Sequence, residues 1–133
     1  VCADIREFLD AKFDTILLLM NGSGIAGTLD GLYHLLRHLK KLLFPGGQIL
    51  MDSSDISYLF REEDGSEWID LSNDRYYGEM IYEVSYRSIH RDKFSWLFID
   101  YELLTEIAGK AGLSCQLVAE GENDDYLSRL YIP

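Results

Sequence analysis

Polar side chains collect where two apolar segments of the chain end. The apolar run Thr15–Met20 is followed by Asn21 and Ser23, and the run Gln48–Met51 is followed by Asp52-Ser53-Ser54-Asp55. Carboxylates at such positions can act as a base or bind a substrate. Because open parallel sheets bind ligands at the carboxyl ends of their strands, we expect these polar groups to share one site.

A continuous β-α-β unit from Phe13 to Asp55 positions those groups. Thr15–Met20 is apolar at nearly every position, which is typical of a parallel strand covered by helices on both faces. Thr28 predicts the N-cap of a helix whose leucines recur at spacings of three and four. The sequence Phe44-Pro45-Gly46-Gly47 ends that helix, and Gln48–Met51 is then the second buried strand.

The rest of the chain predicts a loop, a hairpin, a helix and two strands. Asp52 to Gly78 shows no sustained period and indicates a loop with one short helix. Met80–Arg87 and Phe94–Ile99 are expected to pair as an antiparallel hairpin. The remaining elements are a helix capped by Asp100 and ended by Gly112, and strands near Ser114–Ala119 and Tyr126–Ile132. With 133 residues, we expect one domain over the whole chain.

The charge of the chain opposes two classes of partner. Twelve Lys+Arg against 23 Asp+Glu give a net charge of −11, which opposes binding to nucleic acid or anionic lipid. The basic cluster of Arg37, His38, Lys40 and Lys41 falls at the end of the first helix, where cations complement the helix dipole. No apolar run reaches the roughly 18 residues of a membrane span, and Cys2 and Cys115 match no metal spacing. We expect a soluble, cytoplasmic protein without a metal.

The glycines Gly22, Gly24 and Gly27 fit the G-x-G-x-x-G pattern between a strand and a helix. This spacing allows an NAD(P)- or FAD-binding domain, in which helix N-terminal amides would hold a diphosphate and Asp52 the ribose hydroxyls. Thr28, the best N-cap, lies after the third glycine, which would place the helix N-terminus away from the phosphates. The dinucleotide interpretation therefore remains an alternative.

The segments ADIREF, FDTILLLMN, a leucine-rich helix and LLFPGGQILMDSSD follow one another in this order. Downstream come EVSYR, FSWLFIDYELLTEIAGKAGL and YLSRLYI. Over nearly the whole chain, this order resembles the second half of a class I S-adenosylmethionine-dependent methyltransferase. The resemblance implies an α/β fold with a partial Rossmann-like sheet of the family's strands four to seven, the last antiparallel, with flanking helices and an inserted hairpin.

The resemblance also implies S-adenosylmethionine as the cofactor and assigns part of its pocket. Asp4 would face the adenine amino group with Ile5 beside the ring, while Met20, Asn21 and Gly22 would line the methionine part and the methyl-transfer channel. The family's glycine-rich loop and ribose-binding acid do not occur in this sequence, which opens VCADIREF without a methionine. We therefore expect the C-terminal portion of a methyltransferase domain that is inactive alone and binds the cofactor weakly or not at all.

Methyl transfer requires no catalytic triad, because an enzyme can act by holding donor and acceptor in line. The sequence shows no catalytic triad, since Gly22-Ser23-Gly24 does not fit the G-x-S-x-G pattern of a nucleophilic serine. Asp52, Asp55 and Tyr77 are the candidates for binding the methyl acceptor, a small molecule or another group that the sequence does not identify. Turn formation by the two acids and core packing of the aromatic residue are the alternatives.

A third interpretation keeps the fold without the activity, as a non-catalytic acidic interaction domain. Its most specific version is a receiver-like phosphoacceptor with Asp52 at a strand end. The adjacent acidic pair and the later strand-end lysine of such proteins are not evident. The wider class of interaction domains stays open.

The strand Thr15–Met20 further predicts self-association. In the family the fourth strand pairs with the first, and this sequence does not contain that first strand. Unpaired amides and carbonyls beside an apolar run form a template for another chain. We expect copies to associate by edge pairing or by exchange of elements.

Overall fold

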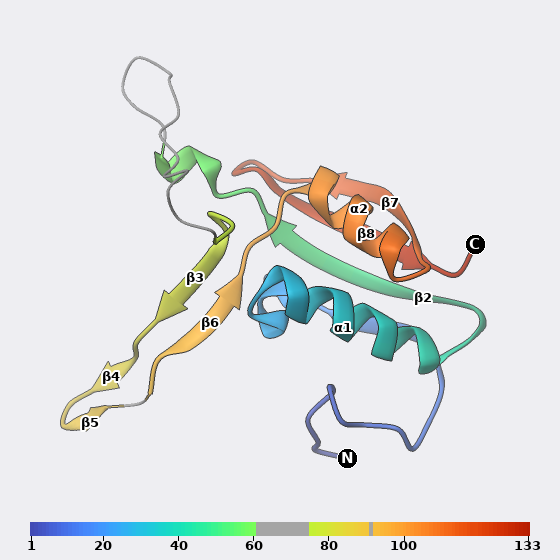
Figure 1. The fold of residues 1–133 in the computed structure, drawn as a ribbon, viewed down its shortest axis with the longest axis horizontal. Coiled ribbons are helices and arrows are strands. Elements are labelled where there is room, and N and C mark those ends of the chain that lie inside the picture. Colours follow the sequence, from blue (N-terminus) through green and yellow to red (C-terminus); the bar gives the residue numbers. More distant parts are fainter. Residues whose placement is uncertain (61–74, 91) are drawn as a thin grey trace.

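Four strands form one mixed sheet in the order β1-β2-β8-β7 (Figure 1). The structure, a computed structural model, describes residues 1–60, 75–90 and 92–133. β1 (Phe13–Leu18) and β2 (Leu43–Ser54) are parallel, whereas β8 (Asp125–Tyr131) runs antiparallel to both β2 and β7 (Ser114–Glu120). The predicted α/β fold, a partial Rossmann-like sheet with an antiparallel last strand, is confirmed.

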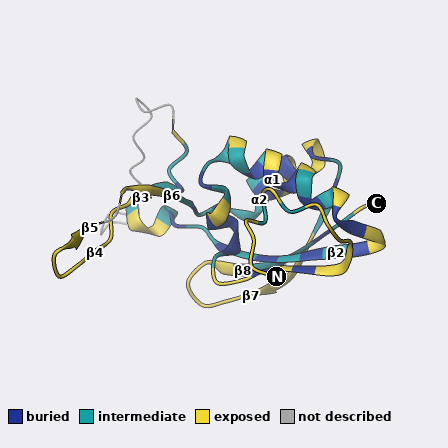
Figure 2. Ribbon diagram, turned by 90° about the horizontal axis from the view of Figure 1, so that it is seen from below, coloured by how far each residue is buried: buried dark blue, intermediate teal, exposed yellow. Residues whose placement is uncertain are grey.

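Two α-helices cover one face of this sheet (Figure 2). α1 (Leu29–Lys41) begins after Thr28, whose Oγ1 accepts the Gly31 N–H at 3.0 Å. α2 (Tyr101–Lys110) begins after Asp100, whose Oδ1 accepts the Leu103 N–H at 2.9 Å. Both predicted N-caps are therefore confirmed.

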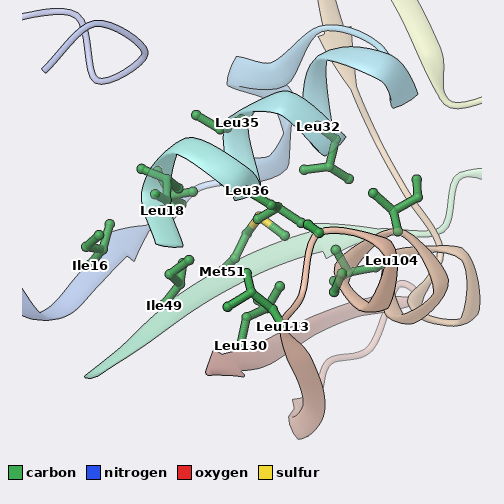
Figure 3. Close-up of a cluster of buried hydrophobic side chains, with 14 of the residues drawn as sticks. Ile16, Leu18, Leu32, Leu35, Leu36, Ile49, Met51, Leu104, Leu113 and Leu130 are labelled. Atoms are coloured by element: carbon green, nitrogen blue, oxygen red, sulfur yellow. The ribbon is translucent and has the colours of Figure 1, made fainter. Parts of the chain in front are cut away.

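The core lies between these helices and the sheet (Figure 3). Ile49 and Met51 of β2 and Leu130 of β8 are fully buried together with Leu36 of α1 and Leu104 of α2. Every second residue of β2 points into this cluster, as the two-residue period of a strand requires. Burial of these aliphatic side chains against α1 and α2 is the main source of stability.

A β-hairpin extends away from the sheet (Figure 1). β3 (Glu79–Tyr82) pairs antiparallel with β6 (Phe94–Leu97), and at the tip β4 (Ser85–Tyr86) pairs with β5 (Ile89–His90). The predicted hairpin is confirmed. Two short 3-10 helices complete the described elements, η1 (Gly22–Ala26) and η2 (Ser57–Phe60).

Several expected boundaries were wrong. β2 begins at Leu43 rather than Gln48 and extends to Ser54; Phe13 pairs with Leu43 and Thr15 with Gln48, so the residues between bulge out of the ladder. Most of the expected loop from Asp52 to Gly78 lies outside the described residues.

The expectation that Thr15–Met20 is covered on both faces was also wrong. The strand ends at Leu18, and Leu17 and Leu19 are 57% and 52% exposed. Both described α-helices lie on the opposite face, so nothing among the described residues covers these side chains. No described helix is long and apolar enough to cross a membrane.

Candidate functional site

The loop after β1 is held by the carboxylate of Asp52 at the end of β2. Met20 and Asn21 have left-handed backbone angles, with φ of 64° and 55°, which are unfavourable for residues other than glycine. Asp52 Oδ2 accepts the Asn21 N–H at 3.0 Å, and Oδ1 accepts the Gly22 N–H at 3.4 Å. Ser54 Oγ donates to Asn21 Oδ1 at 3.1 Å. The structure therefore brings Asn21, Gly22 and Asp52 together, with Met20 exposed beside them.

Gly22 and Gly24 allow close packing of side chains against the loop. A Cβ at Gly22 would lie 2.7 Å from Leu18 Cβ, and a Cβ at Gly24 would overlap the Trp96 indole. A dinucleotide fingerprint instead uses its glycines to approach a diphosphate. Here the space beside Gly24 is already occupied by protein.

The N-terminus of α1 is occupied as well. Glu79 Oε1 accepts the Leu29 N–H at 2.9 Å, and Thr28 accepts the Gly31 N–H. A diphosphate at this helix end would meet the negative charge of Glu79. These contacts disfavour the NAD(P)- or FAD-binding alternative.

Two fully buried serines connect the loop after β1, β2 and the end of β6. Ser23 Oγ and Ser53 Oγ lie 2.7 Å apart, Ser23 Oγ donates to the Leu97 carbonyl at 2.9 Å, and Ser53 Oγ accepts the Ile99 N–H at 3.0 Å. Both hydroxyls are therefore satisfied and attach the return strand of the hairpin to the sheet. The expectation that these serines face a ligand was wrong; Ser53 continues the inward alternation of Ile49 and Met51, a signal visible in the sequence.

Two tyrosine–carboxylate pairs lie beyond the end of β2. Tyr77 donates from its hydroxyl to Asp55 Oδ1 at 2.6 Å, and Tyr76 donates to Asp100 Oδ2 at 2.6 Å. The two tyrosine rings are 4.4 Å apart between centroids. Asp55 Oδ1 also accepts the Ser57 N–H at 3.0 Å. Asp55 and Tyr77, both predicted as acceptor-binding residues, thus contact each other.

Burial keeps these tyrosines protonated. Desolvation, followed by the hydrogen bond to Asp100, raises the pKa of Tyr76 well above its usual value. Desolvation and the hydrogen bond to Asp55 raise the pKa of Tyr77 in the same way. Both hydroxyls therefore act as hydrogen-bond donors over the physiological pH range.

An acidic hollow of about 710 Å³ opens beside Asp55 and Asp100. It lies between the start of α2 and the turn that joins β7 to β8. Its other lining residues are Tyr101, Glu102, Leu117, Glu120, Gly121, Asp124, Asp125 and Tyr126. Sequence reasoning did not identify this hollow, because its acids come from three separate segments of the chain.

Asp4 and Ile5 lie apart from the other predicted residues. The Asp4 carboxylate pairs with the Arg6 guanidinium, with Nη2 2.6 Å from Oδ2, and the hydrogen bonds from Arg6 lower the pKa of Asp4 to about 2. Ile5 packs against the core and lines an apolar hollow of about 440 Å³ with Phe8 and Phe13. Among the described residues, no hydrogen bond joins this segment to the loop Met20–Gly22.

Metal-binding side chains do not gather in the described part of the chain. No group of three His, Cys, Asp or Glu residues within residues 1–60, 75–90 and 92–133 is arranged to hold an ion. Cys2 is exposed and Cys115 half-buried, and neither forms a disulfide.

The chain matches no model of a known protein family and no curated protein. It does match solved structures. A SAM-dependent methyltransferase from Bacteroides fragilis, crystallised with S-adenosyl-L-homocysteine, is 45% identical, with a TM-score of 0.85 over 96% of this chain and 51% of that chain. This chain therefore spans about half of that protein.

Two more distant structures share the fold. The S-adenosylmethionine-dependent methyltransferase of Clostridium acetobutylicum ATCC 824 is 13% identical, with a TM-score of 0.64 over 99% of this chain and 63% of that one. The CcbJ methyltransferase of Streptomyces caelestis is 12% identical. Its TM-score is 0.62, and the match covers 99% of this chain and 62% of that one.

The strand order and the covering helices define a Rossmann-like α/β protein. Within that class, the solved structures that this chain matches are S-adenosylmethionine-dependent methyltransferases, and the resemblance drawn from the sequence is confirmed.

Proposed function

We propose that the protein built on this chain transfers a methyl group from S-adenosylmethionine to an acceptor. The match at 45% identity and TM-score 0.85 to a methyltransferase crystallised with S-adenosyl-L-homocysteine is the observation that carries this proposal. The mixed sheet with its antiparallel last strand agrees with it.

The reaction is an in-line displacement at carbon. The acceptor nucleophile forms a bond to the methyl carbon while the bond from that carbon to the sulfonium breaks, and sulfur keeps the electron pair. The products are the methylated acceptor and S-adenosylhomocysteine, and a protonated acceptor must release one proton. Alignment of donor and acceptor supplies most of the rate enhancement in such a reaction, so no nucleophilic side chain is assigned.

The donor would lie along the carboxyl end of β1. In our proposal Met20, Asn21 and Gly22 line its methionine part. The Asp52 carboxylate holds this loop, in which Met20 and Asn21 have left-handed backbone, by accepting the Asn21 and Gly22 N–H groups. Ile5 lies beside an apolar hollow of about 440 Å³, which suits a purine ring, and Asp4 would face the adenine amino group. For this contact Asp4 must release part of its pairing with Arg6.

The acceptor would lie toward Asp55. Oδ1 of this carboxylate is occupied by Tyr77 and Ser57, while its other oxygen makes no hydrogen bond within the described residues. That free oxygen is suited to take the proton that the acceptor releases. Tyr77 would then be a positioning residue, and Asp52 would support the donor loop beside the acceptor. The chemical identity of the acceptor stays unassigned.

Residues 1–133 would be the C-terminal portion of the methyltransferase domain, with a cytoplasmic location. Because the chain spans 51% of its 45% identical relative, we propose that it supplies one wall of the donor pocket and binds the cofactor weakly alone.

A chimera tests these proposals. The part of the Bacteroides fragilis protein that this chain does not span would be joined to residues 1–133, and binding of S-adenosylhomocysteine would be measured by calorimetry. We expect the chimera to bind much more tightly than the isolated chain, and Asn21→Ala to weaken binding. A chimera that is folded by circular dichroism but binds NAD instead of S-adenosylhomocysteine would contradict the proposal.

Variants of the chimera then separate the acceptor side from the donor side. Asp55→Asn and Tyr77→Phe should leave the affinity for S-adenosylhomocysteine unchanged. Once an acceptor has been identified, Asp55→Asn should lower kcat, and Tyr77→Phe should shift the pH profile of kcat.

A further inference from the structure

We propose that a basic hollow at the amino ends of β1 and β2 binds a compact polyanion, a molecule that carries a chain of two or more phosphate groups. The inference is independent of methyl transfer. The hollow has a volume of about 980 Å³, and among the described residues no aspartate or glutamate lines it. Five cationic side chains do, namely Lys12, Arg37, Lys40, Lys41 and Lys110.

Three separate segments bring these cations together. Lys12 directly precedes β1, Arg37, Lys40 and Lys41 lie in the last turns of α1, and Lys110 ends α2. Both helices end at the right of Figure 1, where β2 begins its course toward the other end of the sheet. The sequence showed only the part of this cluster that lies on α1, because its other members meet it through the fold.

Helix dipoles account for only part of the cluster. Cations in the last turn of a helix complement the partial negative charge of its C-terminus, which explains Lys41 and Lys110. That charge is roughly half an elementary charge per helix, which is too small to balance five cations. Lys12 belongs to no helix. An excess of positive charge therefore remains in the hollow.

Most of these cations have no counter-charge. The side chains of Lys12, Lys40 and Lys41 form no hydrogen bond or ion pair with another residue in the described part of the chain. Lys110 is paired, with its Nζ 2.6 Å from Glu106 Oε1. Both members of that pair are exposed on one helix, so water competes with it and it holds Lys110 only weakly.

Two of the cations are held at the hollow by neighbours that carry no charge. A Cβ at Gly112, where φ is 84°, would lie 2.5 Å from the half-buried Lys40 Nζ, so this glycine leaves room for the amine. Arg37 Cζ lies 5.6 Å from the centre of the Tyr33 ring, and its Nη1 donates to the Tyr33 hydroxyl at 3.4 Å. Both side chains keep most of their N–H donors for a ligand.

A short phosphate chain fits this hollow better than a long polyanion does. Phosphate groups supply several negative charges and several acceptor oxygens, which match arginine and lysine donors. The volume of about 980 Å³ is within the usual range of small-molecule sites, about 300–1,000 Å³. A nucleic acid or an anionic membrane would extend beyond the hollow and meet a protein whose net charge is −11.

An NMR titration of the chain with inorganic triphosphate tests the site. We expect shifts at the amides of Lys41, Gly46 and Gly112, with an affinity that falls steeply as salt is added. Lys40→Gln should weaken binding about tenfold, the effect of one charge-assisted hydrogen bond, and Lys40→Arg should retain it. The matched control Lys93→Gln removes the same charge from the hairpin and should leave the affinity unchanged. Circular dichroism checks that each variant is folded.

A parallel titration with ATP identifies the source of the phosphates. Tighter binding of ATP than of triphosphate would indicate a nucleotide, and equal affinity would indicate the phosphate chain alone; either result supports the site.

Four results would overturn the proposal. They are an absence of shifts at low salt, equal losses in Lys40→Gln and Lys93→Gln, shifts confined to Gly22 and Leu29, and tighter binding of a single-stranded oligonucleotide than of triphosphate. The second would show only a general effect of charge, and the third would place the anion at the start of α1.

Discussion

The two faces of β1 have the same kind of side chain and opposite surroundings. Ile16 and Leu18 are 7% and 8% exposed under α1, whereas Leu17 and Leu19, their neighbours in the chain, are more than half exposed. The difference comes from the helices, which cover only one face of the sheet. One face therefore stabilises the fold, and the other adds little to the core of the described residues.

One substitution on each face of β1 tests this contrast, and the buried one should have the largest effect on stability among these predictions. Leu18→Ala should lower the free energy of unfolding by about 2–5 kcal/mol, because it leaves a cavity in the core. Leu17→Ala should lower it by less than about 1 kcal/mol, since little area is buried there. Urea unfolding of the two variants measures both losses. Equal losses would show that the exposed face is covered.

A second pair of substitutions compares a buried and a part-buried polar side chain at the end of β2. Ser53→Ala should cost about 1–3 kcal/mol, because it leaves the buried Ile99 N–H without its partner and removes one of the two hydrogen bonds of the Ser23 hydroxyl. Ser54→Ala removes one part-buried hydrogen bond to Asn21 and should cost about 0.5–1 kcal/mol. Thermal unfolding of the two variants gives the comparison, and a larger loss for Ser54→Ala would contradict the inward direction of Ser53.

The smallest effect on stability is expected at the exposed N-terminal turn, which belongs to neither face of β1. Arg6 holds the pKa of Asp4 at about 2, below its ordinary value of 3.8. The folded-state pKa is the lower one, so the contribution of this pair to stability is present above pH 3.8 and is lost as the pH falls through about 2. Arg6→Gln should return the pKa of Asp4 toward 3.8. An NMR titration that finds no change on substitution would show that the pair does not form.

The elements that the sequence predicted well are those whose signal is local. Thr28 and Asp100 predicted both N-caps, since a cap depends on residues within one turn. The alternation in Met80–Arg87 and Phe94–Ile99 predicted the hairpin in the same way. Here the local pattern and the tertiary structure agree.

Most of the errors concern surroundings that no local pattern encodes, and the one at Ser53 overlooked a local alternation. The apolar run Thr15–Met20 predicted two covered faces, but cover depends on helices supplied by other segments. Ser53 was expected to face a ligand although its phase in β2 points inward. The Glu79 carboxylate at the start of α1 lies 50 residues away along the chain, so the glycine pattern alone could not exclude a diphosphate.

Part of the candidate site was predictable. Asn21, Gly22 and Asp52 meet because parallel strands end at the same edge, and this could be read from the β-α-β unit. The positions of Tyr76 and of the acidic hollow beside Asp55 could not be predicted, since they depend on the hairpin and on the turn between β7 and β8.

The most direct test of the central claim is an NMR titration of the isolated chain with S-adenosylhomocysteine. We expect shifts at the amides of Ile5, Asn21 and Gly22, with a dissociation constant of about 1 mM or weaker, equivalent to about 4 kcal/mol. Micromolar affinity would contradict the claim that these residues form only one wall of the donor pocket. Shifts confined to Gly27 and Leu29 at the start of α1 would contradict the location of the pocket itself.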